Sequence, residues 1–398
     1  MKILQINSVC GYGSTGRIVT DLYDILEENG NECWIAYGRG NAPQKYKTIK
    51  IGEQHNIYTN VIKARIFDSE GFNAKKETIE FIKKIEVLKP EIVHLHNLHG
   101  YYLNIEILFN YLNTVNIPVF WTLHDCWPFS PHSAYIDYMK DGSLPHKSNR
   151  EDLKEYPKSI LKNNSSYNYI KKEKIFTSLK NLTIICPSFW LAEMVKNSFL
   201  NIYDIKIINN GIDLNQFTPT ESNFREIYSL KHKKIILGVA SVWEERKGLK
   251  FFNNLADDLN SSYKIMLVGI NKSDQKKVNS KILALDKTNN VEELAKLYTA
   301  SNVFLNPTLE DNFPTTNIES IACGTPVITF ETGGSPESIV AGTGLVVKKD
   351  NYNDLLKTIQ KFDFNKDYRN ACIEQSKKFD KNKIYKEYLQ IYNTLNVN

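Results

Sequence analysis

The chain has 398 residues, a formal net charge of +5, 42% hydrophobic residues and 24% charged residues. This length exceeds what one ordinary hydrophobic core serves, and this composition excludes a disordered chain, so we expect a globular protein of two domains. No apolar run reaches the roughly 18 residues of a membrane-spanning helix, which predicts that no segment crosses a bilayer. The six cysteines are scattered without a pairing pattern, as is typical of a reducing cytosol.

The first residues, 1–7, are too few and too polar for a signal peptide. We interpret them as the first β-strand of a cytoplasmic protein. Short apolar segments rich in β-branched residues then alternate with helical patterns along the whole chain. Near-continuous apolar strands of this kind form parallel sheets that helices cover on both faces. The predicted strands are 2–7, 32–38, 91–96, 119–124 and 182–188, and then 233–241, 263–269, 280–285, 302–306, 326–330 and 345–347.

Two such series of strands predict an α/β protein with two doubly wound, Rossmann-like domains. The boundary is expected at the turn signal Asn209-Asn210-Gly211, with Pro219 shortly after it. The first domain is therefore predicted to span 1–208 and the second 209–379.

A glycine-rich segment, Gly11-Tyr12-Gly13-Ser14-Thr15-Gly16-Arg17, follows the first predicted strand and opens a helix. Its glycines let the backbone approach a ligand closely, and a helix N-terminus favours an anion. The spacing is not that of the dinucleotide fingerprint, and the second strand does not end in the acid that a ribose needs. These two differences disfavour an NAD-dependent oxidoreductase.

Histidines end two neighbouring predicted strands. His94 and His96 alternate with apolar residues and so share one face of the sheet. His124 and Asp125 end the next strand, at the carboxyl edge where open α/β sheets bind ligands. No cysteine or carboxylate stands at ligand spacing from His94, His96 and His99, so we expect no zinc site and no other metal.

A basic segment, 146–180, carries nine Lys and Arg against four acidic residues, a local charge of +5. Such a segment suits either a solvated helix or peripheral contact with an anionic membrane. Nucleic-acid binding is not expected, because no stacking aromatic module accompanies the charge.

The second half carries a cationic turn and an acidic turn. Trp243 to Gly248 leave a strand and include Arg246 and Lys247, cations suited to a phosphate. Glu310 and Asp311 follow the strand 302–306, and Phe313-Pro314-Thr315-Thr316 then opens a helix that carries Glu319. Carboxylates accept bonds from hydroxyls, while helix N-termini bind phosphates, so this grouping suits a sugar joined to a phosphate.

In this order the segments resemble the donor-sugar site of the GT-B glycosyltransferases of family 4, the retaining group that uses nucleotide sugars. The resemblance runs from the first strand to the last helix and is nearest to bacterial capsule, exopolysaccharide and O-antigen enzymes. It implies two domains facing a cleft, with the last helix, about 380–398, packing back on the first domain. It also implies metal-independent transfer of a hexose or N-acetylhexosamine from a nucleotide sugar, without a cofactor.

The resemblance assigns a role to each candidate residue. Lys247 binds the donor diphosphate, Asp311 accepts bonds from the sugar, and His124 faces the sugar, so these three are the expected catalytic residues. Glu319 is expected to bind the ribose. The remaining donor-side residues are Arg246, Glu310, Phe313, Pro314, Thr315 and Thr316, and those on the acceptor side of the cleft are Gly13, Ser14, Arg17 and Asp125.

The chain departs from the family pattern at two positions. The position of the first of two paired glutamates is Asp311, so either Asp311 or the neighbouring Glu310 fills that role. Val242 stands where the family has a phosphate-binding Arg, and Arg246 is the candidate substitute. A simpler interpretation of Glu319 is a capping box with Thr316, which needs no ligand.

The expected substrates follow from the same resemblance. The donor is expected to be a UDP-sugar, with GDP-mannose second, and the acceptor a saccharide or a polyprenyl-linked saccharide at the inner membrane face. Two alternatives remain open, a nucleotide-sugar epimerase of the same fold and a non-catalytic scaffold of a polysaccharide-synthesis complex.

Overall fold

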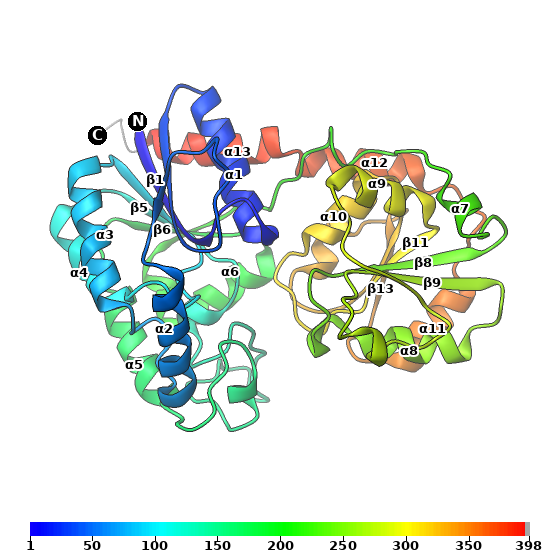
Figure 1. The fold of residues 1–398 in the computed structure, drawn as a ribbon, viewed down its shortest axis with the longest axis horizontal. Coiled ribbons are helices and arrows are strands. Elements are labelled where there is room, and N and C mark those ends of the chain that lie inside the picture. Colours follow the sequence, from blue (N-terminus) through cyan, green and yellow to red (C-terminus); the bar gives the residue numbers. More distant parts are fainter. Residues whose placement is uncertain (395–398) are drawn as a thin grey trace. The chain divides into compact units, whose positions relative to one another are not determined.

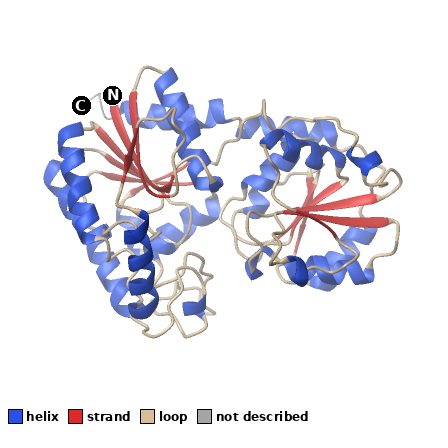
Figure 2. Cartoon of the chain, viewed as in Figure 1, coloured by secondary structure: helices blue, strands red, loops and turns tan. Residues whose placement is uncertain are grey.

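The computed structural model describes residues 1–394. The chain divides into two units, one from Met1 to Asn209 together with the chain from Tyr385 onward, and one from Asn210 to Ile384. Each unit is built around one parallel sheet with helices on both faces (Figure 1, Figure 2), which confirms the predicted fold class. The expected boundary at 208/209 lies one residue before this division. The last four residues of the predicted C-terminal helix, 395–398, lie outside the described residues.

Unit 1 contains a seven-stranded sheet in the order β3-β2-β1-β4-β5-β6-β7, with every neighbouring pair parallel. Its strands are β1 (Lys2–Val9), β2 (Glu32–Arg39), β3 (Thr48–Lys50), β4 (Ile92–Leu95), β5 (Val119–Thr122), β6 (Leu182–Cys186) and β7 (Asp204–Ile207). Its helices are α1 (Gly13–Glu28), α2 (Gln54–Phe67), α3 (Lys75–Leu88), α4 (Ile105–Val115), α5 (Ser165–Phe176) and α6 (Phe189–Lys196), and α13 (Lys381–Asn393) continues into this unit from unit 2.

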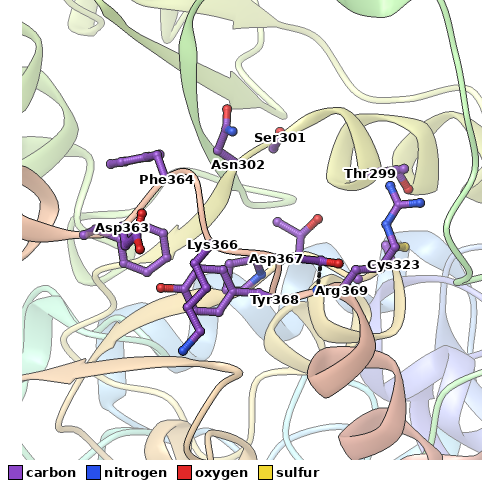
Figure 3. Close-up of a pocket in the computed structure, with 14 residues that line it drawn as sticks. Thr299, Ser301, Asn302, Cys323, Asp363, Phe364, Lys366, Asp367, Tyr368 and Arg369 are labelled. Carbon is purple, nitrogen blue, oxygen red and sulfur yellow. Dashed lines mark hydrogen bonds between the residues drawn. The ribbon is translucent and has the colours of Figure 1, made fainter.

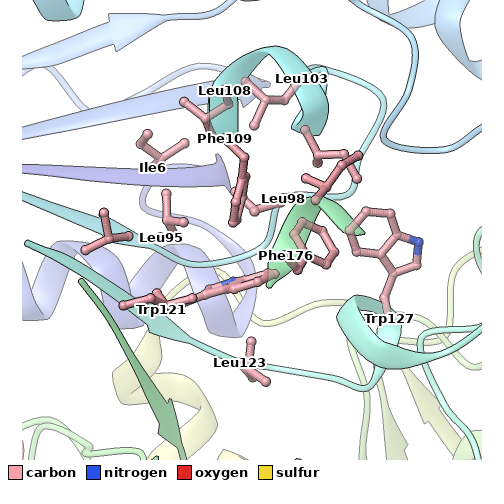
Figure 4. Close-up of a cluster of buried hydrophobic side chains, with 14 of the residues drawn as sticks. Ile6, Leu95, Leu98, Leu103, Leu108, Phe109, Trp121, Leu123, Trp127 and Phe176 are labelled. Carbon is pink, nitrogen blue, oxygen red and sulfur yellow. The ribbon is translucent and has the colours of Figure 1, made fainter. Parts of the chain in front are cut away.

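Alternation along the strands decides which helices cover each face of this sheet. Leu4 and Ile6 of β1 face a large apolar core that also includes Leu95 and Trp121 (Figure 4). Helices α3 to α6 contribute to that core. Gln5 points the other way, toward α1, where its amide donates to the Val19 carbonyl. The second face is therefore the more polar one, and it carries the histidines.

Helix α13 packs on this polar face. The Tyr392 hydroxyl lies 2.7 Å from His94 Nδ1, and its ring lies 4.7 Å from that of Phe120. The Tyr388 hydroxyl accepts from Thr122 Oγ1 at 3.3 Å. Both tyrosines are almost fully buried. A helix at the far end of the sequence thus completes the core of the first unit.

Replacing Tyr392 with alanine is expected to lower the free energy of unfolding of unit 1 by about 3–5 kcal/mol, the range for truncating a buried aromatic ring. The change leaves a cavity beside Phe120 and removes the hydroxyl partner of His94. Tyr392→Phe keeps the ring and loses only the hydrogen bond, at a cost of about 1–2 kcal/mol. Chemical denaturation of both variants checks this order, and equal losses would contradict it.

Unit 2 contains a six-stranded sheet in the order β10-β9-β8-β11-β12-β13, again with parallel pairs. Its strands are β8 (Lys234–Val239), β9 (Tyr263–Val268), β10 (Leu283–Leu285), β11 (Val303–Asn306), β12 (Val327–Phe330) and β13 (Gly344–Val347). Its helices are α7 (Phe224–Ile227), α8 (Leu249–Asp258), α9 (Val291–Ala300), α10 (Thr315–Ala322), α11 (Tyr352–Lys361) and α12 (Arg369–Ser376).

Two apolar cores lie on the two faces of this second sheet. Residues of α9, α10 and α12 pack with one set of strand side chains, such as Leu237 and Phe304. Residues of α8 and α11 pack with the alternate set, such as Ile236 and Leu305. Near-continuous apolar strands are what a sheet buried on both faces requires.

All eleven predicted strands are present, and two further strands were missed. The missed strands, β3 and β7, are the two edges of the first sheet. β3 has only three residues, and β7 alternates between exposed and half-buried positions, so neither has the continuous apolar pattern of a central strand. The predicted strand 280–285 is shorter than expected, because only Leu283–Leu285 pair with β9.

The six cysteines are buried free thiols. Among residues 1–394, no helix is long and apolar enough to cross a membrane.

Candidate functional site

The candidate residues of unit 2 lie at the point where its strand order reverses. From β8 the chain continues to β9 on one side and later returns to β11 on the other. The loops after β8 and β11 therefore leave the carboxyl edge of the sheet side by side. In open α/β sheets this crevice is where ligands bind.

A cation and a carboxylate meet between these two loops. Lys247 Nζ lies 2.5 Å from Asp311 Oδ2, and the two side chains are 22% and 16% exposed. The residues are 64 positions apart in sequence. Both charges are thus held together and partly open to solvent, at the end of the sheet where a ligand is expected.

Arg246 joins the same loops through the backbone. Its Nη1 donates to the Glu310 carbonyl at 3.2 Å, and its own carbonyl accepts from Leu309 N at 2.7 Å. Its Nε also contacts the Glu244 carboxylate at 3.1 Å. Arg246, the predicted substitute for the missing phosphate-binding Arg, therefore joins the same two loops as Lys247. Val242, which stands where the resemblance places that Arg, is 54% exposed.

Two glycines make this close approach of loops possible. Gly248 has φ +75°, and a Cβ there would lie 2.2 Å from the Pro307 carbonyl oxygen. Gly333 has φ +53°, and a Cβ there would lie 1.8 Å from the Asp311 carbonyl oxygen. Any other residue at either position would push the loop after β11 away, so these glycines fix where Asp311 stands.

Helix α10 begins at Thr315, with Pro314 as its N-cap and no side-chain cap. The proposed capping box between Thr316 and Glu319 is therefore wrong, because Thr316 already lies inside the helix. Thr315 and Thr316 are half-buried in its first turn. Their position leaves the amide groups of a helix N-terminus beside the acidic turn, an arrangement that favours an anion.

Asn317 fixes the direction of α10, a role that the sequence analysis missed. This fully buried side chain accepts from Asn306 Nδ2 at 2.8 Å and donates to the Ser335 carbonyl at 3.1 Å. It thereby joins the end of β11, the start of α10 and the turn after β12. A buried amide one turn into a helix gives no distinctive sequence signal.

Glu319 is 2% exposed, and its Oε2 accepts from the Tyr298 hydroxyl at 3.2 Å. Tyr298 belongs to α9 and is itself fully buried. The helix carries Glu319 about one turn inward from its first residue, Thr315, on the face toward α9. Tyr298 thus contacts this carboxylate from the neighbouring helix, and this partner was not predicted.

Phe313 contributes packing at this turn. Its side chain is 4% exposed and lies 5.8 Å from the ring of Phe379. Its carbonyl accepts from Asn210 Nδ2 at 3.1 Å. The buried ring of Phe313 anchors the acidic turn to the core. The neighbouring residues of the turn then lie at the carboxyl edge of the sheet.

In unit 1 the strand order reverses between β1 and β4. The glycine-rich segment follows β1 as predicted and leads into α1, which begins at Gly13. Gly13 and Ser14 are exposed and Arg17 is half-buried. Gly11 N donates to the Gly16 carbonyl at 3.1 Å, which closes the loop at the helix N-terminus.

A chain of hydrogen bonds fixes the protonation of His124. The Gln5 amide nitrogen donates to the Val19 carbonyl, so its oxygen faces His96 Nε2 at 3.2 Å, and that nitrogen must carry hydrogen. His96 Nδ1 is then the acceptor that lies 3.1 Å from His124 Nε2. This network assigns the hydrogen of His124 to Nε2 and leaves its Nδ1 with a lone pair.

Burial keeps this group of histidines neutral. It lowers the pKa of His124 to about 4 and that of His94 to about 3, and it lowers the pKa of His96 well below its ordinary value. The rings of His94 and His96, with centroids 4.1 Å apart and planes tilted by 38°, confirm that both lie on one face of the sheet. At neutral pH His124 is therefore a neutral hydrogen-bonding group rather than a cation.

Asp125 points to a different partner. Its Oδ2 lies 2.7 Å from His99 Nε2, and its Oδ1 accepts from Trp127 N at 3.0 Å. Burial alone would raise the pKa of Asp125, but His99 and the Trp127 amide hold it below its ordinary value. His99 Nδ1 also contacts the Tyr156 hydroxyl at 3.2 Å. This hydrogen-bonded pair orders the loop after β5, and His99 was not predicted as the partner of Asp125.

A pocket of about 140 Å³ lies at the opposite, amino edge of the unit 2 sheet. Asn302 and Pro326, which precede β11 and β12, line it together with Phe364 and Tyr368 (Figure 3). None of the predicted site residues contributes to it. Among residues 1–394, no group of three or more His, Cys, Asp or Glu is placed to hold a metal ion.

Comparison with protein families gives two matches that follow the two units. Residues 15–216 match the model described as Glycosyltransferase Family 4, and residues 220–379 match the model described as Glycosyl transferases group 1. The first match alone covers half of the chain. The chain belongs to glycosyltransferase family 4.

Curated relatives with similar sequences are bacterial glycosyltransferases. The chain is 25% identical over 230 residues to the putative colanic acid biosynthesis glycosyl transferase WcaC of Escherichia coli, covering 54% of this chain and 55% of that protein. It is 28% identical over 180 residues to the N,N'-diacetylbacillosaminyl-diphospho-undecaprenol alpha-1,3-N-acetylgalactosaminyltransferase of Campylobacter jejuni. This match covers 42% of this chain and 47% of that protein. The matched part spans about half the length of these family relatives.

Solved structures match over almost the whole chain. Sucrose-phosphate synthase from Thermosynechococcus elongatus gives a TM-score of 0.74 at 16% identity, covering 99% of this chain and 98% of that one. Anabaena HepE, solved with UDP and glucose, gives a TM-score of 0.68 at 12% identity, and the match covers 99% of this chain and 100% of that one. At these identities the likeness establishes the GT-B fold of this family member.

Proposed function

We propose that this protein is a retaining hexosyltransferase that moves a hexose or N-acetylhexosamine from a nucleotide sugar to a saccharide acceptor in cell-surface polysaccharide synthesis. The observation that carries the proposal is the Lys247–Asp311 pair, which lies beside the α10 N-terminus where the strand order of unit 2 reverses. A cation, a carboxylate and the amides of a helix N-terminus are the groups that a sugar diphosphate needs.

Each group has a task in the proposed transfer. As the bond from the sugar to the diphosphate lengthens, negative charge grows on the phosphate, where Lys247, Arg246 and the first amides of α10 stabilise it. Positive charge grows on the sugar ring, and Asp311 offsets it. Glu319 accepts hydrogen bonds from the ribose. The two cations supply the positive charge, so the proposed chemistry needs no metal.

The local contacts favour Asp311 over Glu310 for the first acidic role. The Asp311 carboxylate contacts Lys247 directly. The backbone of Glu310 contacts Arg246, through its carbonyl. A diphosphate that binds Lys247 therefore brings its sugar next to Asp311.

The donor is proposed to be a UDP-sugar, in line with the UDP present in the HepE structure. The acceptor is proposed to be a saccharide on a polyprenyl diphosphate, because the Campylobacter relative is named for such an acceptor. Such an enzyme would work in the cytoplasm at the inner face of the membrane. We further propose that unit 1 binds the acceptor near His124. The lone pair of His124 Nδ1 would accept a hydrogen bond from a hydroxyl group of the acceptor.

The test is to incubate the protein with UDP- and GDP-sugars and to measure release of the nucleoside diphosphate, with and without lipid-linked saccharides. A transferase releases the diphosphate and joins the sugar to the acceptor with the anomeric configuration of the donor. Conversion of the nucleotide sugar without release would make the protein an epimerase, and no binding of any donor would make it a scaffold.

Replacing Glu319 with glutamine is expected to weaken UDP binding by about 10- to 100-fold, because hydrogen bonds to a charged group contribute about 1.5–3 kcal/mol. Tyr298→Phe is the matched control, since it removes the hydroxyl that contacts Glu319 but keeps the carboxylate. Isothermal titration with UDP measures both. Equal affinities of Glu319→Gln and the unmodified protein would remove Glu319 from the site.

A further inference from the structure

An ordered loop in unit 1 presents two large apolar side chains to solvent. Ile160 and Leu161 are 72% and 70% exposed. Their backbone is nevertheless fixed, because Ile160 N donates to the Arg65 carbonyl at 2.7 Å and Lys162 N donates to the Ile66 carbonyl at 3.1 Å. Two neighbouring large apolar side chains that stay exposed on a backbone fixed by hydrogen bonds suggest an interaction site.

Helix α2, to whose last residues this loop is bonded, carries more exposed apolar groups. Tyr58 and Ile62 are 62% and 57% exposed, and Phe67 is 44% exposed. Tyr58, Ile62 and Arg65 have the spacing i, i+4, i+7, which places them on one face of the helix. This face turns away from the core, to which α2 contributes residues such as Ile57 and Ala64.

The start of α5 extends the same surface. Asn164, just before α5, donates to the Phe67 carbonyl at 2.7 Å, and Asn168 Nδ2 donates to the Asp68 carbonyl at 2.5 Å. Tyr167 and Ile170 are each 65% exposed. We define the apolar–basic surface as the exposed residues of 54–67 and 158–170, two segments that these hydrogen bonds hold together.

The charges on this surface all have one sign. Segments 54–67 and 158–170 contain no Asp or Glu. Their cations are Lys63, Arg65, Lys158 and Lys162, all exposed, and Lys162 Nζ lies 5.3 Å from the centre of the Phe67 ring. By contrast, segment 146–157 mixes both signs and pairs Lys154 with Glu151 at 2.6 Å. Segment 146–157 is therefore neutral overall, with three cations and three acids, whereas 158–170 has two cations and no acid.

We infer that the apolar–basic surface docks on a bilayer that contains anionic lipid. Ile160 and Leu161 would enter the headgroup–acyl boundary, Tyr58 and Tyr167 would lie at headgroup level, and the four cations would contact lipid phosphates. An absence of acids over two segments fits a uniformly anionic partner. The inference deepens the proposed function, since a lipid-linked acceptor lies in a bilayer, but docking requires no turnover.

Flotation or sedimentation with vesicles of phosphatidylcholine, with and without phosphatidylglycerol, tests the inference. The protein is expected to bind only the anionic vesicles appreciably. Lys158→Gln with Lys162→Gln should weaken this binding by about 25-fold, at roughly fivefold per cation. Ile160→Ser with Leu161→Ser should weaken it by about tenfold or more.

Matched controls come from unit 2. Ile227→Ser removes a side chain that is 65% exposed, and Lys272→Gln with Lys276→Gln removes two exposed cations. Both are expected to bind vesicles like the unmodified protein. Equal binding of all variants, or no preference for anionic vesicles, would overturn the inference. So would an oligomer in sedimentation velocity that dissociates on Ile160→Ser with Leu161→Ser, because the surface would then join copies of the chain.

A thermal shift with UDP separates this result from the proposed function. The surface variants should keep the shift, since their changes lie in unit 1 and the proposed donor residues lie in unit 2. Vesicle binding without a thermal shift by UDP would contradict the proposed donor site but support the docking surface. A thermal shift by UDP without vesicle binding would support the donor site and contradict the docking surface.

Discussion

Replacing Lys247 with alanine is expected to weaken binding of UDP by about 10- to 100-fold, because a charge-assisted hydrogen bond to phosphate contributes about 1.5–3 kcal/mol. The folded protein should tolerate the change. The Lys247–Asp311 pair is partly exposed, and pairs of this kind contribute about 0–1 kcal/mol to stability. Isothermal titration with UDP measures the first effect and thermal unfolding the second.

Lys250→Ala is the matched control for this experiment. Lys250 lies in α8, three residues after Lys247, and pairs with Asp350 at 3.0 Å. Its removal changes the net charge of unit 2 by the same amount without touching the loop after β11. If the two variants lost UDP affinity equally, the effect would be one of net charge, and Lys247 would have no specific role.

Lowering the pH from 7 to 5 is expected to destabilise unit 1 by about 2 kcal/mol for each of three histidines, because of linkage between protonation and folding. His94, His96 and His124 have folded-state pKa values below their ordinary value. Below about pH 6.5 the unfolded chain therefore binds protons that the folded chain does not. The free energy of unfolding is therefore highest above about pH 6.5, and it falls progressively as the pH drops toward the folded-state pKa values of these histidines.

Denaturant unfolding followed by tryptophan fluorescence measures this loss, because four of the five tryptophans, all but Trp243, belong to unit 1. His96→Gln should reduce the loss between pH 7 and pH 5 by about one histidine's share, about 2 kcal/mol. His55→Gln is the control, since His55 is exposed on α2 and its removal should leave the loss unchanged. A stability independent of pH over this range would contradict the neutral histidine chain.

The strands and the chemistry of the loops were predictable because they depend on local patterns. A continuous apolar segment such as that around Leu305 needs burial on both faces, and acids directly after it must lie at the carboxyl edge. The pairing of the loops after β8 and β11 also followed, because a doubly wound sheet brings these two edges together. Lys247 and Asp311 were thus expected at one crevice.

The partners of the site residues could not be predicted, because they depend on side chains that meet only after packing. Tyr298 reaches Glu319 from the preceding helix, and His99 reaches Asp125 from the neighbouring strand end. Neither pair has a distinctive spacing. The capping box of Thr316 shows the converse error. The local pattern fits a helix start with Thr316 as N-cap, but the N-cap is Pro314, so the helix begins two residues earlier than the pattern implied.

Hydrogen exchange with and without saturating UDP tests the central claim most directly, because it locates the ligand without prior choice of a residue. We expect slower exchange of the backbone amides in two segments, 244–250 and 309–319, which leave the sheet on either side of the strand reversal. Protection confined to 362–369, which line the pocket at the amino edge, would contradict the account.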